Sequence, residues 1–106
     1  MCMSDKHQAP QGRVELVKRL GQLVPLLKGN VYPVDYDTIK TAHTKFLTTR
    51  TDEDLRGYVK NQLAPELNSL RGIARVGELY QRDPGRTLIQ SAINCLDDII
   101  QDIMQS

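Results

Sequence analysis

The side chains that could carry out chemistry are few and widely separated in this sequence. The histidines are His7 and His43, and the cysteines are Cys2 and Cys95. A metal site needs several such ligands at short spacing on a shared face, and a nucleophile needs a base within reach. Neither pattern is present, and no glycine-rich phosphate loop occurs. The sequence therefore predicts no catalytic, metal-binding or cofactor-binding residues, and we expect no enzyme.

His43 lies in the Ala-His-Thr triplet at 42–44, which resembles the start of the phosphoacceptor motif of histidine phosphotransfer domains. Those domains are also four-helix bundles, and they carry lysine and glycine three and four positions after the histidine. This sequence has Phe46 and Leu47 there. His43 is also one turn from Ile39 and Leu47, near an expected apolar face. We therefore interpret it as a partly buried structural residue.

The basic residues form a pattern that indicates binding more clearly than the histidines or cysteines do. Arg71, Arg75 and Arg82 are spaced by four and seven residues, so they project from one side of an expected third helix, and Arg86 follows. Such a stripe could bind phosphates or an acidic partner. Acidic residues are interleaved with it, and residues 51–86 carry equal numbers of bases and acids. A salt-bridged, solvated face is the alternative interpretation.

Two tyrosines flank Pro33 in an expected connection. Tyrosines in loops often anchor interfaces, because they offer a large contact area at a low entropy cost. They could equally fold back against the end of the helices. The candidate partner-binding residues are therefore Tyr32, Tyr36, Arg71, Arg75, Arg82 and Arg86.

Size and charge limit the classes of partner. A chain of 106 residues fits one domain, and its net charge of +1 argues against a strongly electrostatic nucleic-acid binder. No apolar run approaches the roughly 18 residues that span a membrane. The N-terminus has no apolar segment of a secretory signal, and the two cysteines are typical of a reducing compartment. We expect a cytoplasmic protein without a membrane partner or a cofactor.

Apolar residues at spacings of three and four predict four amphipathic helices. The first covers about 13–28 and the second about 38–49. The third starts after Thr51, with a helical pattern from Leu55 for nearly thirty residues, and the last follows Pro84 to about Met104. Ile93 and Leu96 belong to the apolar face of the last helix, which is the clearest of the four.

Polar residues mark the expected helix starts. The segment Val31–Asp37 is expected to be a connection, and Asp35 or Asp37 is expected to cap the second helix. Thr51 is expected to cap the third helix and Asp83 the last. Each of these side chains could accept a hydrogen bond from an unpaired backbone N–H.

Prolines and glycines mark the interruptions. Pro25 should kink or end the first helix, which Gly29 then terminates. Pro65 either kinks the third helix or marks the meeting point of two helices. Gly72 and Gly77 are expected inside the third helix, where a missing side chain would allow close packing.

Four amphipathic helices with short connections bury their apolar faces most simply around one core. We therefore predict an all-α antiparallel four-helix bundle over residues 12–106, preceded by a flexible tail over 1–11. The acids of the last helix are expected to form a solvated face. Asp98 and Asp102 end that helix without a base, so Arg13 or Arg50 is expected to neutralise them, with Lys18 or Arg19 one or two turns away. The alternative is that a second chain supplies the base.

The functional hypothesis is a non-enzymatic protein–protein interaction module, acting as a small adaptor, regulator or assembly subunit. Its partner would be another protein or a second copy of the chain. The alternative is a nucleic-acid-associated protein that uses the arginine stripe. Salt dependence would separate the two, because phosphate binding weakens steeply as salt rises.

Overall fold

Four helices account for most of the part of the chain that the structure describes. The computed structural model describes the backbone of residues 4–105 and the side chains of residues 12–105. The separate helices are α1 (Ser4–Leu27), α2 (Pro33–Thr48) and α5 (Gly85–Gln105). The remaining one is continuous and consists of α3 (Asp52–Tyr58), a π-helical turn (Val59–Leu63) and α4 (Ala64–Val76). A short 3-10 turn (Glu78–Tyr80) precedes α5, and the expected all-α class is confirmed.

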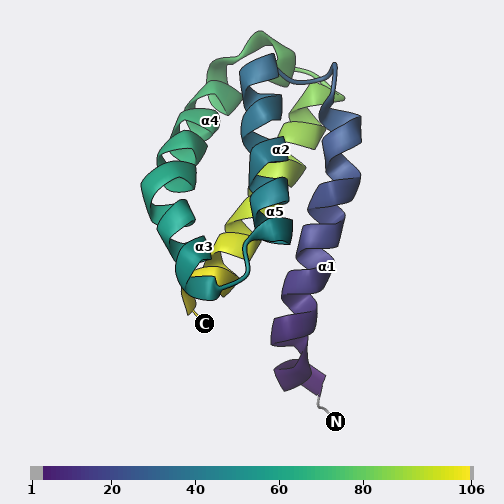
Figure 1. Cartoon of the computed structure of the whole chain (residues 1–106). Helices are drawn as coiled ribbons and strands as arrows, with labels where there is room; N and C mark the ends of the chain where they lie inside the picture. The colour runs from purple at the N-terminus through teal and green to yellow at the C-terminus, as the bar shows by residue number, and fades with distance from the viewer. Residues whose placement is uncertain (1–3, 106) are drawn as a thin grey trace.

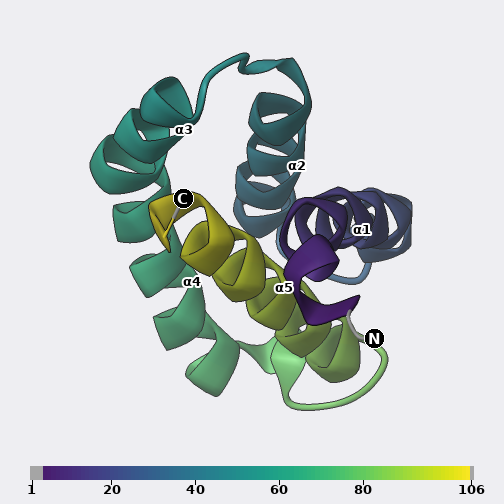
Figure 2. The same ribbon diagram turned by 90° about the horizontal axis from the view of Figure 1, so that it is seen from below.

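Successive helices run in opposite directions, which gives the expected antiparallel bundle (Figure 1). Viewed from below, α5 lies between α1 and the continuous α3–α4 helix (Figure 2). It therefore contributes more buried apolar residues than any other helix: Ile89, Ala92, Ile93, Cys95, Leu96, Ile99 and Ile103. The expected core positions Ile93 and Leu96 are 3% and 0% exposed, which confirms the apolar face of the last helix.

The first helix is longer than its apolar pattern indicated. It begins at Ser4 rather than near Arg13, and residues 1–3 of the expected tail lie outside the described residues. The flexibility of that tail stays a prediction. Pro25 lies inside the last turn, and the helix continues to Leu27. Gly29 then takes a φ of +85°, a left-handed value that favours glycine, so the expected stop is confirmed.

The start of the second helix was predicted wrongly. It begins at Pro33 rather than Thr38, because a proline ring fixes φ near the helical value and its missing N–H is not needed in a first turn. Asp35 and Asp37 therefore lie inside the helix, and the expected capping by either residue was wrong. Asp35 is 8% exposed, and its carboxyl group accepts a hydrogen bond from the Tyr80 hydroxyl at 2.5 Å.

The third helix starts where it was expected, and Pro65 does not break it. The Thr51 hydroxyl accepts a hydrogen bond from the Asp54 N–H at 3.2 Å, which confirms the cap. The π-helical turn at Val59–Leu63 directly precedes α4, and Pro65 occupies the first turn of α4. Wide turns and prolines are the usual causes of helix bending. The α3–α4 helix accordingly bows away from α2 (Figure 1).

The prediction that the third helix continues for nearly thirty residues from Leu55 was wrong at its end. The regular helix stops at Val76, and Gly77 has extended backbone. A Cβ on Gly77 would lie 2.9 Å from Cε2 of Tyr32, so this glycine allows the ring to approach the chain. A Cβ on Gly72 would meet nothing within 4 Å, and the packing role expected for Gly72 was therefore wrong.

The start of α5 packs tightly against two carbonyl groups. Asp83 Oδ1 accepts a hydrogen bond from the Thr87 N–H at 3.1 Å, which confirms its capping role. A Cβ on Gly85 would lie 2.8 Å from the carbonyl oxygen of Asn30 and closer still to that of Leu79. Backbone atoms cannot easily move aside, so this position requires glycine.

Candidate functional site

A groove of about 430 Å³ opens between α1 and α2. Its lining residues are Arg13, Val14, Val17, Lys18, His43, Phe46 and Leu47. Val14 on α1 is 63% exposed and Leu47 on α2 is 64% exposed. The expectation that Leu47 belongs to a buried apolar face was therefore wrong. Single exposed apolar side chains are common on protein surfaces, whereas two of them in one groove form a candidate binding patch.

His43 lies between the two helices that form the groove. A Cβ on Gly21 of α1 would lie only 2.6 Å from Nε2 of His43, so the missing side chain leaves room for the imidazole ring. His43 is half-buried, as the sequence predicted for a structural histidine. Its ring is part of the groove lining.

Phe46 is held in place from the other side by α3. Its ring meets the Tyr58 ring edge to face, with 6.5 Å between centroids and an interplanar angle of 80°. Burial raises the pKa of Tyr58 to about 12. The Tyr58 hydroxyl is buried and has no hydrogen-bond partner among the described residues. Through the contact between the rings of Phe46 and Tyr58, the apolar lining of the groove is continuous with the core.

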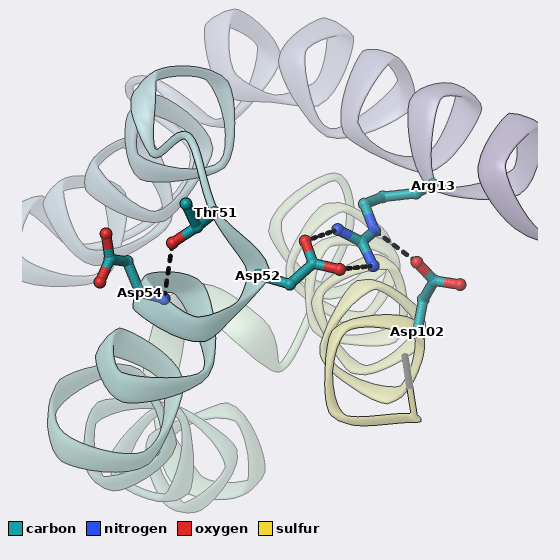
Figure 3. Close-up of polar contacts among 5 residues, drawn as sticks. All are labelled: Arg13, Thr51, Asp52, Asp54 and Asp102. Atoms are coloured by element: carbon teal, nitrogen blue, oxygen red, sulfur yellow. Dashed lines mark hydrogen bonds and ion pairs between the residues drawn. The ribbon is translucent and has the colours of Figure 1, made fainter.

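Arg13 joins three helices at one end of the groove (Figure 3). Its Nη1 donates to Oδ1 of Asp52 in α3 at 2.7 Å, and its Nε donates to Asp102 in α5. Hydrogen bonds and the charges of these two carboxylates raise the pKa of Arg13. The expected pairing of Arg13 with Asp102 is confirmed. The contact with Asp52 was not expected, because its place in the first turn of a helix already accounted for an acid there.

The predicted arginine stripe is not a single helix face. Nη1 of Arg71 donates to Oδ2 of Asp97 at 2.9 Å, and both side chains stay partly exposed, so this pair fits the alternative interpretation of a salt-bridged, solvated face. Arg75 is exposed on α4, Arg82 lies beyond the end of that helix, and Arg86 is exposed in the first turn of α5. The nucleic-acid hypothesis stays a prediction, and the four arginines come from two helices and the connection between them.

The two candidate tyrosines pack against the end of the bundle. The Tyr32 ring meets Tyr80 edge to face at 5.3 Å, and its hydroxyl accepts a hydrogen bond from the Leu79 N–H at 3.2 Å. Tyr36 is half-buried, and the Lys40 ammonium lies 5.8 Å from its ring centroid. Tyr32 therefore folds back onto the bundle, which was one of its two expected roles.

A second groove, of about 470 Å³, opens between α2 and α4. Val34, Asp35 and Glu66 are among its lining residues. The buried carboxyl group of Asp35 already accepts the Tyr80 hydroxyl, so it has a structural role. The groove between α1 and α2 is the stronger candidate, because its lining is mainly apolar and includes two exposed apolar side chains.

Cys95 is poorly suited to nucleophilic chemistry. Its thiol is buried and donates to the carbonyl oxygen of Leu16 at 3.2 Å. Burial raises the pKa of this thiol, which disfavours the reactive thiolate. Cys2 lies outside the described residues. Among the side chains of residues 12–105, no three from His, Cys, Asp or Glu are grouped so that they could hold a metal ion.

Comparisons with models of known protein families, with curated proteins and with solved structures give no match. Within the described part of the chain, none of the helices is both long enough and apolar enough to cross a membrane. The function of the groove must therefore be inferred from its own geometry.

Proposed function

We propose that this protein is a non-enzymatic protein–protein interaction module that docks its partner in the groove between α1 and α2. The observation that carries this proposal is the exposure of Val14 and Leu47 within one apolar groove. Burying apolar surface contributes about 25 cal/mol per Å², so a partner that covers both residues gains binding free energy.

The shape of the groove favours an amphipathic helix of the partner protein. Two antiparallel helices form its walls (Figure 1), and a third helix can pack against both. A small ligand on Val17 and Phe46 would leave the exposed side chains in water. A helix with apolar residues three and four positions apart would cover the interior of the groove and the exposed pair together.

A second copy of the chain is the competing occupant. In a symmetric dimer the same surface patch faces itself, so Lys18 would meet a groove that carries the same charge. Like charges across an interface are unfavourable. We therefore favour a partner helix and expect the isolated protein to be a monomer.

The test uses a fluorescein-labelled amphipathic peptide with leucine at helical spacing and glutamine elsewhere. Val14→Gln combined with Leu47→Gln should weaken its binding at least about tenfold, measured by fluorescence anisotropy. Val76→Gln combined with Leu26→Gln is the matched control, because these residues are 73% and 55% exposed and do not line the groove.

Three outcomes would overturn the proposal. The first is a wild-type protein that does not bind the peptide, and the second is a control pair of substitutions that weakens binding as much as the groove pair does. The third is a dimer, detected by sizing, that the groove substitutions dissociate, because the occupant is then a second copy.

A further inference from the structure

The charged and titratable residues that line the groove between α1 and α2 are all of the basic type. They are Arg13, Lys18 and His43, and none of the described lining residues is acidic. A partner helix that covers the apolar interior would place its own polar edge beside these side chains. The charge on that edge should therefore affect affinity.

Arg13 and Lys18 differ in how firmly they are engaged. The Arg13 guanidinium lies between Asp52 and Asp102, two carboxylates that compensate its charge and fix its position (Figure 3). The Lys18 ammonium lies 3.6 Å from Glu15, and both side chains are more than half exposed. Solvent screens such a pair, so Lys18 is able to exchange Glu15 for a carboxylate of the partner.

We propose that the groove selects partner helices that carry carboxylates beside their apolar face, and that Lys18 recognises this acidic edge. The inference rests on the proposed function, because it requires a helix in the groove. A docked helix displaces water around Lys18, which strengthens the attraction between its ammonium and a carboxylate. A basic edge would instead face the like charge of Lys18 and would bind more weakly.

The first experiment compares three versions of the labelled peptide, with glutamate, glutamine or lysine along one edge and the same leucines. The glutamate peptide should bind tightest and the lysine peptide weakest, with about a threefold difference at each step. The differences should shrink in high salt, because exposed charges are then screened within a few ångströms.

The second experiment changes the protein. Lys18→Gln should remove the preference for glutamate, so that this variant binds the glutamate and glutamine peptides with affinities within about twofold of each other. Glu15→Gln should strengthen binding of the glutamate peptide, because a competing carboxylate is removed. Lys28→Gln is the control, since Lys28 is exposed just after α1 and does not line the groove.

The outcomes separate this inference from the proposed function. If the glutamine peptide does not bind wild-type protein, the proposed function fails. If the glutamine peptide binds but the glutamate peptide binds no tighter than the lysine peptide, only the charge selection is overturned. The assignment to Lys18 is overturned if Lys18→Gln keeps the wild-type preference for glutamate, as the control Lys28→Gln should.

Discussion

Arg13, in the first half of α1, is bonded to Asp102, in the last turn of α5, across a separation of 89 residues. The last helix has no base beyond Arg86, and its acids lie near a helix C-terminus, where negative charge is unfavourable. A base on another helix is therefore needed for compensation. Arg13 provides it for Asp102 and also holds Asp52 at the start of α3.

Removing the charge of Asp102 should weaken the fold. We expect Asp102→Asn to lower the free energy of unfolding by about 1 kcal/mol, because it weakens a partly buried, charge-assisted bond to Arg13. Asp98→Asn is the matched control, because Asp98 is exposed one turn earlier, and its effect should stay within about 0.5 kcal/mol. Urea unfolding measures both variants, and an Asp102→Asn protein as stable as wild type would contradict the stabilising role of the pair.

The two glycines Gly85 and Gly72 should respond in opposite ways to alanine. Gly85→Ala should cost about 1–3 kcal/mol, because its Cβ would press on the carbonyl groups of Leu79 and Asn30. Gly72→Ala should stabilise by about 0.5–1 kcal/mol, because alanine restricts the unfolded chain and meets no obstacle in α4. Thermal unfolding of both variants is the measurement, and a shift of the same sign in both would contradict the packing described at Gly85.

Removing the hydroxyl group should affect stability differently at the two buried tyrosines, Tyr80 and Tyr58. Tyr80→Phe should cost about 1–3 kcal/mol, because its hydroxyl donates to Asp35 and accepts from the Tyr32 N–H. Tyr58→Phe should leave stability unchanged or raise it by up to about 1 kcal/mol, since the Tyr58 hydroxyl is buried without a partner. The measurement is again urea unfolding. Equal losses in the free energy of unfolding of the two variants would contradict the finding that the Tyr80 hydroxyl is hydrogen-bonded and the Tyr58 hydroxyl is not.

Alkaline pH should destabilise the fold through the same tyrosines. Burial raises the pKa of Tyr58 from 10.0 to about 12, and burial together with the Asp35 hydrogen bond also raises the pKa of Tyr80. Below pH 10 both folded and unfolded chains keep these protons, so stability is unaffected. Between pH 10 and about 12 the unfolded chain loses them first, and the free energy of unfolding falls as pH rises.

The Tyr58→Phe protein provides the control for this pH dependence. Its free energy of unfolding should fall less steeply than that of wild type between pH 10 and about 12, as measured by urea unfolding at a series of pH values. Identical slopes in the two proteins would show that Tyr58 does not retain its proton in the folded state.

Local signals in the sequence were sufficient for much of the fold. The apolar face of α5 and the caps at Thr51 and Asp83 depend on residues within a turn or two, and the structure confirms them. The start of α2 was predicted wrongly because of Pro33. A proline favours extended structure for the residue before it and helix for the residues after it. The prediction relied on the first effect, whereas the second decides where the helix begins.

The candidate groove could not be predicted from periodicity. Regular spacing places Leu47 on an apolar face, but it does not say whether another helix covers that part of the face. The exposure of Leu47 depends on how α1 and α2 pack, which includes the close approach of His43 to Gly21. The Arg13–Asp52 contact is likewise tertiary, because it joins residues 39 positions apart.

The π-helical turn at Val59–Leu63 has a consequence for the length of the chain. Each residue of an α-helix rotates the side-chain direction by about 100°, and a π turn absorbs one extra residue. Leu55 and Tyr58 on one side of the turn and Leu67 and Leu70 on the other all reach the same core. A deletion of one residue within the turn would restore regular helix and swing the first pair away from the core. The π turn thus holds one residue more than a regular α-helix would, and this extra residue keeps the apolar faces of α3 and α4 on the same side of the third helix.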